Sequence, residues 1–384
     1  MKIQRTFFKM AIGFIPLLFW HSMRGQGCVV IRHFSSCSGA FPQSGLLGEG
    51  ELMLGVNYRY FKSFRHFRGT EEEPDRVSNG TEVINHSHAW DFTATYGISD
   101  RWFATLAIPT VINTRSSLYE HGREERNTTY SRGLADIRWS VGYWLLDPLE
   151  QPKGNIAIAL GMKLPTGNFN ASDIFYNVGV DGRPEVRPVD QSIQPGDGGF
   201  GISAEFQYYW EFLPKLFMYG GGFYLSNPRE INGTRTFRET LNPLLENEAI
   251  MSVPDQYSLR MGLTRVLSEA FTASLGARFD AVPVRDFIGG SGGFRRPGNV
   301  LSIDPGITCL RGNFGLTLSV PVAVRRERPQ SVTDLETELL TGTPRNGDAA
   351  FADYVLNLGL VYRFGRKGIP IDPDLRDAFK PAEE

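Results

Sequence analysis

The chain has little of what builds a helical membrane protein, a disulfide scaffold or a nucleic-acid surface. No apolar run reaches the roughly 18 residues that a membrane-spanning helix needs, which excludes a bundle of such helices. Three cysteines in 384 residues are too few for a fold held together by disulfides. A formal net charge of -2 gives no indication of a nucleic-acid partner. A β-barrel is not excluded, because half of each barrel strand and all of the loops can be polar.

The N-terminus has the layout of a secretory signal. Lys2, Arg5 and Lys9 precede an apolar run over residues 10–20, and small or polar residues follow that run. We therefore expect residues 1–27 to be a signal peptide that is removed on export.

The cysteines fit an exported chain. Cys28 and Cys37 are close enough in sequence to form a disulfide within residues 28–47, a segment expected to be periplasmic or to act as a short plug. Acylation of Cys28 is the alternative, although Gly25 stands where a lipobox usually has leucine. Cys309 alternates with apolar neighbours and is expected to be a small buried or lipid-facing strand residue.

Residues 131–167 show the pattern that most of the chain repeats. Apolar side chains occupy every second position, a period that is typical of strands and not of helices. A turn through Asp147 and Pro148 separates two such segments, which predicts an antiparallel hairpin with one apolar and one polar face. The apolar face of the first segment carries Ala135, Ile137, Trp139, Val141, Tyr143 and Leu145.

About twelve such segments follow one another between residues 48 and 364, and their connections alternate between long polar loops and tight turns. An outer-membrane barrel has this arrangement, with long extracellular loops and short periplasmic turns. An even number of strands also brings the last strand beside the first, so that no edge is exposed. The sequence therefore predicts an all-β fold, a transmembrane antiparallel up-and-down β-barrel over residues 48–364 with a periplasmic tail over residues 365–384.

Several strand limits and faces follow from the same pattern. The first strand is expected to end near Phe61, and long loops are expected over residues 62–85 and 113–130. The glycines, including Gly220, are assigned to the inward face, about one per strand. Aromatic residues near strand ends fit interfacial girdles. The apolar row Phe217, Tyr219, Phe223 and Leu225 is counted with the lipid-facing rows.

If the apolar rows face lipid, the opposite faces line a lumen of mixed charge. Charged side chains are tolerated there when they are hydrated or paired across strands. The lumen is therefore predicted to be either a wet pore or a plug of ion pairs, and the inward glycines favour the pore. The predicted lumen-lining residues are Glu51, Arg59, Asp91, Asp136, Arg138, Lys163, Glu205, Arg260, Arg278, Asp280, Asp304 and Asp353.

Catalytic and metal-binding candidates are few. His86 and His88 form an isolated H-x-H pair, and His66 and His121 fall in loops, without the second spaced pair that a metal site needs. No serine is evident on the same inward face as a histidine, so a nucleophilic hydrolase is not indicated. We predict no enzyme activity, no cofactor and no metal.

Two segments resemble a known family. GLADIRWSVGYWLLDP over residues 133–148 and IALGMKLPTGN over residues 158–168 are similar to the meta-pathway phenol-degradation-like outer-membrane transporters, barrels in the style of long-chain fatty-acid channels. The resemblance implies uptake of small aromatic or otherwise hydrophobic molecules and supplies no catalytic residues. Fatty-acid channels have a substantial N-terminal hatch, whereas residues 28–47 suffice here for a short plug at most. The matched positions are Gly133, Asp136, Lys163, Pro165, Thr166 and Gly167.

The leading functional prediction is an outer-membrane channel or transporter that takes up small, aromatic or hydrophobic solutes. The alternative is a non-conducting structural or adhesive barrel that binds partners through long loops such as residues 165–195 and 325–348. The expected partners are outer-membrane lipid, a small-molecule solute and the barrel-assembly machinery, which would recognise the closing strand that ends at Phe364. Nucleic acid is not expected as a partner.

Overall fold

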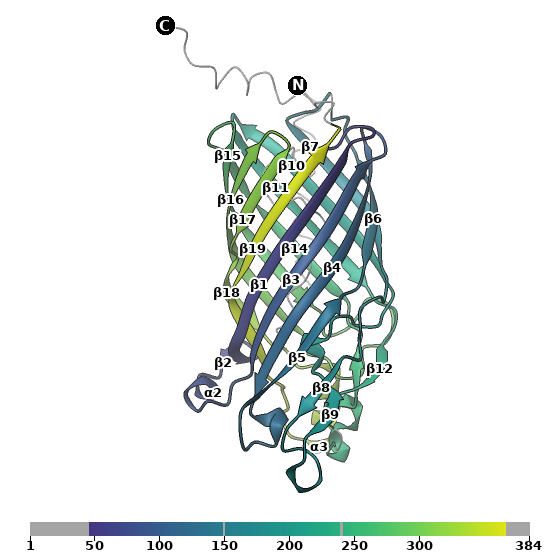
Figure 1. Cartoon of the computed structure of the whole chain (residues 1–384), viewed down its shortest axis with the longest axis vertical. Helices are drawn as coiled ribbons and strands as arrows, with labels where there is room; N and C mark the ends of the chain where they lie inside the picture. The colour runs from purple at the N-terminus through teal and green to yellow at the C-terminus, as the bar shows by residue number, and fades with distance from the viewer. Residues whose placement is uncertain (1–45, 149, 239–240, 366–384) are drawn as a thin grey trace.

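The computed structural model describes residues 46–148, 150–238 and 241–365, and these residues form a closed antiparallel β-barrel (Figure 1). The main sheet has 15 strand segments. Residues 127–134 and 138–144 share one position in the wall, and residues 314–319 and 322–327 share another. The two-residue segment 71–72 only extends the rim. The described wall therefore has twelve positions, which confirms the predicted fold class.

The barrel is closed by pairing between its first and last strands. β1 (Leu52–Arg68) pairs with β19 (Ala349–Phe364) from Leu52 opposite Phe364 to Phe67 opposite Ala349. The wall therefore has no free first or last strand, as a lipid-embedded sheet requires. The remaining wall strands are β3 (Ile84–Gly97), β4 (Trp102–Ser117), β5 (Asn127–Leu134), β6 (Arg138–Trp144), β7 (Gly154–Lys163), β10 (Gly201–Leu213), β11 (Leu216–Ser226), β14 (Gln256–Val266), β15 (Phe271–Val282), β16 (Gly298–Arg311), β17 (Phe314–Ser319) and β18 (Val322–Glu327).

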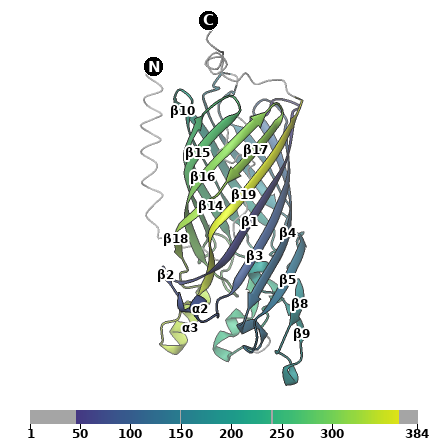
Figure 2. The same ribbon diagram turned by 60° about the vertical axis from the view of Figure 1, so that its left-hand side comes forward.

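Short turns lie at one end of the barrel and long loops at the other, as Figure 2 shows. The shared wall positions are β5 with β6 and β17 with β18. Within the described ranges no helix is long and apolar enough to cross a membrane. The loop end carries β2 (Glu71–Glu72), α2 (Asp75–Ser78), η2 (Tyr119–His121), β8 (Ser172–Phe175), η3 (Val180–Gly182), β9 (Glu185–Pro188), η4 (Gln191–Ile193), β12 (Ile231–Arg235), η5 (Pro243–Glu248), β13 (Ile250–Ser252) and α3 (Val332–Thr341).

Two predicted strand limits were wrong. β1 continues to Arg68 instead of ending near Phe61, and β4 and β5 together occupy half of the predicted loop over residues 113–130. The hydrogen-bonded ladder continues where the strands reach the polar end of the barrel. The outward positions there no longer need to be apolar, so the alternation that marks a strand in the sequence disappears.

The outside of the barrel exposes apolar side chains over most of its height. Leu160 is 69% exposed and Leu275 is 60% exposed, while Lys163 and Thr272 on the alternate face are buried. A soluble sandwich would cover these apolar rows with a second sheet. Their exposure around a closed sheet is what contact with hydrocarbon requires, so the chain is a transmembrane barrel of the bacterial outer membrane.

β11 departs from the predicted faces. The row predicted to face lipid is 7% exposed or less and faces the lumen, and Gly220 lies on the outside beneath the ring of Tyr208. The assignment of this row to lipid was therefore wrong, because strand period alone gives two faces without saying which one is inward. The inward residues of β11 are Phe217, Tyr219, Phe223 and Leu225.

Candidate functional site in the barrel lumen

Aromatic side chains from neighbouring strands line the inner end of the lumen. The ring of Trp144 lies 6.0 Å from that of Phe103 and 6.0 Å from that of Tyr209. Phe217 joins this cluster, and Leu46, which precedes the first strand, is buried against it. The lumen is therefore not lined by charge alone, because its inner end is aromatic.

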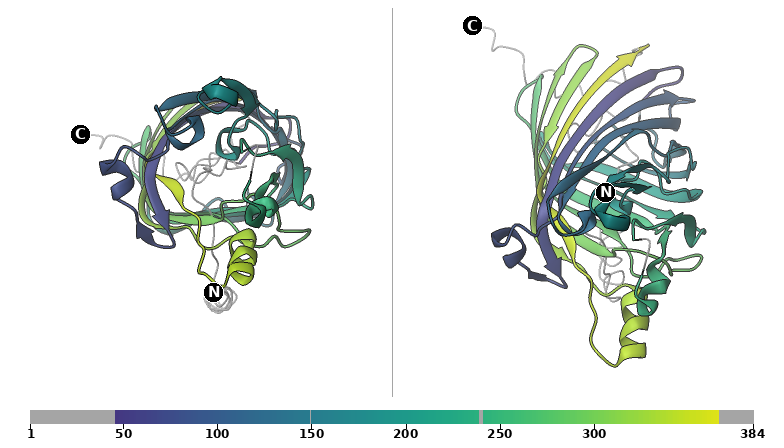
Figure 3. Two further views of the ribbon diagram at one scale, coloured as in Figure 1. Left: turned by 90° about the horizontal axis from the view of Figure 1, so that it is seen from below. Right: turned by 60° about the horizontal axis from the view of Figure 1, so that its bottom comes forward.

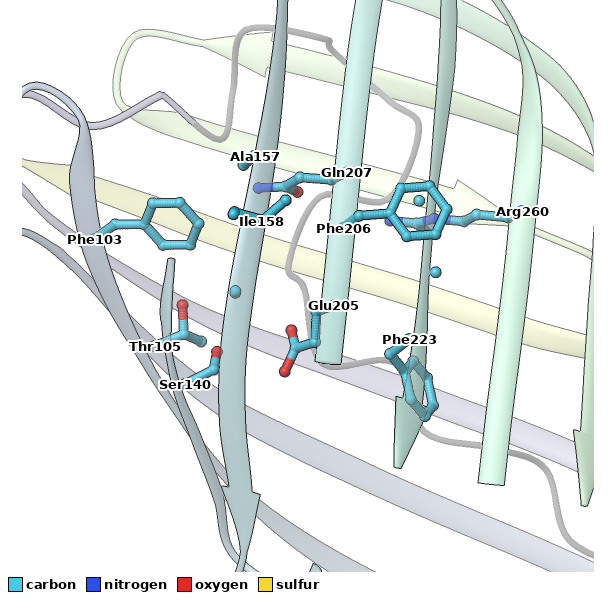
Figure 4. A pocket seen from close by; sticks show the side chains of 13 residues that line it. Phe103, Thr105, Ser140, Ala157, Ile158, Glu205, Phe206, Gln207, Phe223 and Arg260 are labelled. Carbon is cyan, nitrogen blue, oxygen red and sulfur yellow. The ribbon is translucent and has the colours of Figure 1, made fainter. Parts of the chain in front are cut away.

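A small cavity of ≈ 30 Å³ opens beside this cluster (Figure 4). Phe103 and Phe223 supply apolar walls, and Glu205 and Gln207 of β10 lie between them. Arg260 of β14 reaches the same cavity from the next strands. The lining of this cavity has the composition, though not the volume, of a small-molecule site.

A larger cavity of ≈ 100 Å³ lies toward the loop end of the lumen. Its wall side is formed by Arg59, Phe61 and Arg138, and its loop side by Gln194 and Asp197, among others. It is more polar than the inner cavity. The described part of the lumen thus changes from aromatic at the inner end to charged at the outer end.

Most of the predicted lumen residues lie on inward faces, and several are paired. Arg278 and Asp280 form an ion pair at 2.6 Å. Asp353 accepts from both Arg65 at 2.8 Å and Arg326 at 2.7 Å. The inward set is Arg59, Asp91, Arg138, Lys163, Glu205, Arg260, Arg278, Asp280, Asp304 and Asp353, whereas Glu51 lies at the inner rim and Asp136 in a break of the wall.

The residues that carry the family resemblance meet at the break between β5 and β6. Asp136 accepts hydrogen bonds from the backbone N–H of Gly167 at 2.9 Å and of Asp197 at 3.1 Å. Lys163 forms an ion pair with the side chain of the same Asp197. Thr166 fills the gap in the ladder, because its hydroxyl accepts from the N–H of residue 137 and donates to the carbonyl of residue 135.

Glycine is required at one of these matched positions. A Cβ on Gly167 would lie 2.8 Å from the Cα of Gly196 and 3.0 Å from the backbone carbon of Ala135. Gly133 has a positive φ of 142° at the end of β5, and Pro165 lies between the strand end and this contact. The matched residues thus join the broken wall strand to the loop between β7 and β10.

The inner rim is fixed by the residues that precede β1. Glu51 is fully buried, accepts from the N–H of Gly48 at 2.9 Å and pairs with Arg363 of the last strand at 2.6 Å. A Cβ on Gly97 would lie 2.1 Å from the carbonyl oxygen of Gly48. The chain therefore passes tightly over the inner end of β3. The predicted disulfide between Cys28 and Cys37 lies outside the described residues, as do most of the predicted plug, the signal and the tail.

The loop between β7 and β10 folds into the outer mouth (Figure 3). The carboxylate of Asp190, which begins η4, is fully buried and receives both guanidinium nitrogens of Arg296 at 2.7 Å. Arg115 of β4 lies 3.5 Å from the same carboxylate and pairs with Glu120 at 2.6 Å. Asn113 of β4 donates to the carbonyl of residue 193 at 3.1 Å. Barrel wall and two separate loops are thus joined through one carboxylate.

The environment of Asp190 favours its charged form. Burial alone would raise the pKa of Asp190, but the adjacent Arg115 and Arg296 outweigh burial and hold that pKa well below the ordinary carboxyl range. Asp348 has the same balance, because hydrogen bonds and charge from His66 and Arg76 overcome its burial and lower its pKa. The outer loops are therefore held by carboxylates that stay ionised at neutral pH.

Further buried pairs hold the other outer loops. Asp286 and Arg295 form a fully buried ion pair at 2.5 Å in the loop between β15 and β16. Asp334 caps α3 together with Ser331 and pairs with Arg328 at 3.1 Å. The ion pairs hold these loops in folded conformations.

Among the histidines of the described residues, only His86 and His88 are neighbours of one another. His86 and His88 face outward on β3, His66 contacts Asp348, and the other predicted loop histidine, His121, accepts from the N–H of Tyr176 at 3.0 Å. Among the residues that the structure describes, no group of three or more His, Cys, Asp or Glu side chains could hold a metal ion. Cys309 is unpaired and lies on β16.

Comparison with known proteins supports the fold. No family model matches the sequence, and no curated protein matches it. The crystal structure of the COG4313 outer membrane channel from Pseudomonas putida F1 matches with a TM-score of 0.54 at 11% identity, over 83% of this chain and 97% of that one. This likeness is one of fold: the chain has the barrel of an outer-membrane channel.

Two other solved structures are more distant. A FadL homologue from Pseudomonas aeruginosa has a TM-score of 0.39 at 8% identity, over 89% of this chain and 96% of that one. The CymD monoaromatic hydrocarbon channel has a TM-score of 0.41 at 9% identity, over 90% of this chain and 99% of that one. The likeness to the COG4313 channel, at a TM-score of 0.54, places the resemblance seen in the sequence at the level of the barrel.

Sequence reasoning missed the groups that organise the outer mouth. Arg115, Asp190, Asp197 and Arg296 come from one strand and two loops, and no local pattern links them. The sequence contained only a weak indication of this site. Arg115 occupies the next inward position on β4, beyond the predicted end of that strand.

Proposed function

We propose that this protein is an outer-membrane channel for the uptake of small hydrophobic or aromatic solutes. The observation that carries the proposal is the inward aromatic surface, in which Phe103, Trp144, Tyr209 and Phe223 face the lumen of a lipid-embedded barrel. Aromatic rings bind apolar solutes by area and by ring geometry. Glu205 and Arg260 beside them supply polar groups that can orient a substituted ring.

The folded outer loops should hinder the free diffusion of polar solutes and so favour the uptake of apolar ones. The loop between β7 and β10, which is held by a buried ion pair, folds into the mouth, and the charged side chains that face the lumen are of both signs. A narrow mixed-charge opening gives little preference for either ionic sign. Binding along the aromatic wall then distinguishes solutes by their apolar surface.

Solute binding to the purified barrel tests the proposal. We expect a small aromatic probe such as 1-N-phenylnaphthylamine to bind the wild type, and Phe223→Ser to weaken that binding roughly threefold to tenfold, the range of one aromatic contact. The matched control is Phe271→Ser, because Phe271 is 44% exposed on the lipid side. Uptake of toluene by cells should fall with the first variant alone. Equal binding and uptake by both variants would contradict the proposal.

A second candidate, an adhesive barrel, draws support from apolar side chains at the loop tips. Leu339 and Leu340 of α3 are 85% and 73% exposed, and Val180 is 78% exposed. Removing these tips would abolish partner binding if adhesion is the function. The same change should leave solute binding intact or increase access if the barrel is a channel.

A further inference from the structure

A polar and basic patch interrupts the apolar lipid-facing surface at the outer ends of four neighbouring strands. The register of β1, β3, β4 and β5 aligns two outward rows across these strands. Their inward neighbours, such as Ser63, Asn85 and Asn113, are buried, which confirms the outward direction of the rows. One row is Lys62, His86, Thr114 and Tyr130, and the other is Tyr60, His88, Ile112 and Arg132; together with Tyr58 and Trp90 we call them the outer patch.

The outer patch lies at the height of the outer-leaflet headgroups. Tyr96 marks the inner interface on β3, one residue before the turn end of that strand, and is 48% exposed. Ten residues separate it from His86 on the same strand. At about 3.4 Å per residue and a tilt of roughly 40°, this is about 25 Å, the height of the apolar band of an outer-membrane barrel.

The charge of the outer patch is of one sign. Lys62, His86, His88 and Arg132 are its ionisable side chains besides tyrosine, and the outward positions of the four strands carry no aspartate or glutamate. Neither Lys62 nor Arg132 forms an ion pair with any carboxylate in the described part of the chain. Asp173 is near, but it accepts a hydrogen bond from the backbone N–H of Tyr130.

Hydrogen bonds and ring contacts hold the patch in a fixed arrangement. The hydroxyls of Tyr58 and Tyr60 lie 2.8 Å and 3.0 Å from Nδ1 of His88 and His86. The rings of His88 and Trp90 stack at 6.3 Å, and Tyr60 lies 4.9 Å from His88. The imidazoles are therefore oriented before any ligand arrives, and each has its second nitrogen, Nε2, left for another partner.

We propose that the outer patch binds the phosphorylated disaccharide headgroup of the glycolipid that forms the outer leaflet. Lys62 and Arg132 are three strand spacings across and two residues along the strand from each other, about 16 Å, so a disaccharide with a phosphate at each end can meet both long, flexible cations. The His86 and His88 rings donate to phosphate or sugar oxygens between them. The exposed ring of Tyr130 packs against the sugar face. This site is independent of the lumen and of solute uptake.

Binding of purified bis-phosphorylated lipid A to the full-length protein in detergent tests the proposal. We expect the Lys62→Gln/Arg132→Gln double variant to bind about 30-fold more weakly, from roughly fivefold for each cation removed near a lipid surface. The matched control is Arg325→Gln, because Arg325 is also exposed at the outer end but pairs with Glu327. This control should retain wild-type affinity. Unchanged affinity of the double variant would overturn the proposal.

The ligand can be varied as well, which needs no protein variant. Wild-type protein should bind lipid A far more tightly than dephosphorylated lipid A or phosphatidylglycerol at the same mole fraction. Equal binding of the dephosphorylated form would show that phosphate is not recognised. Equal binding of phosphatidylglycerol would show attraction to any anionic lipid, and either result would refute a site for the glycolipid headgroup. Heat-modifiable migration of each variant in gels confirms that its barrel is folded.

Discussion

Replacing Asp190 by asparagine removes the carboxylate that Arg115 and Arg296 share at the outer mouth. The side chain of Asp190 is fully buried, so the variant leaves two guanidinium groups facing a neutral amide. Breaking a buried ion pair by removing one partner costs about 3–5 kcal/mol. If the loop moves away and both guanidinium groups regain contact with water, the equilibrium constant between the docked and the displaced loop changes by roughly two to four orders of magnitude in favour of the displaced loop.

The barrel wall should not sense this change, because its ladder hydrogen bonds do not involve Asp190. We therefore expect Asp190→Asn to raise single-channel conductance in planar bilayers and to speed proteolysis within residues 164–200, with unchanged heat-modifiable migration. The matched control is Asp181→Asn in the same loop, where the carboxylate is exposed. Wild-type conductance together with wild-type resistance to proteolysis in Asp190→Asn would refute the account of the mouth given above.

Three further changes test other parts of the structure. Because the pKa of Asp190 and of Asp348 is lowered, their stabilisation is complete above the ordinary carboxyl pKa of about 3.9 and is lost only below it. Conductance should therefore be equal at pH 7 and pH 5 and rise at pH 3, and a rise between pH 7 and pH 5 would show that other groups control the mouth. Gly167→Ala should lower the free energy of unfolding in urea by about 1–3 kcal/mol, because the new Cβ would lie 2.8 Å from the backbone of Gly196. Gly359→Ala is the control and should be near neutral, because the nearest atom to its Cβ would be 3.6 Å away. Leu160→Arg on the lipid face should cost about 2–4 kcal/mol in equilibrium folding into vesicles, and no cost there would mean that this face does not meet hydrocarbon.

The barrel itself could be read from the sequence because membrane strands obey two constraints at once. Every second residue must suit hydrocarbon, and every strand must end in a turn, so segments such as 154–163 carry a clear period. The same reasoning fails at the outer ends. There, polar surroundings replace hydrocarbon and residues such as Lys62 and Thr114 occupy outward positions. The strands therefore continue without their apolar sequence signal.

The direction of a strand face is harder to read than its period. β11 carries large apolar residues on both faces around three consecutive glycines, so both faces are compatible with lipid by composition. The neighbouring strands decide the matter in space, since Tyr208 covers Gly220 from outside while Phe217 packs with Trp144 in the lumen. The outer mouth was beyond sequence reasoning for a related reason: Asp190 and Arg296 are 106 positions apart and meet only once the barrel exists.

Closure by the final strand has a consequence for biogenesis. Glu51 and Arg363, which pair at the seam, are 312 positions apart, so the free side of β1 has no partner until nearly the whole chain has been made. Until that moment, a nascent chain with an open β1 side can join a second chain as readily as its own end. A chain that stops before β19 should therefore give aggregates and not a smaller barrel, and a periplasmic holdase that keeps chains apart should matter most during this interval.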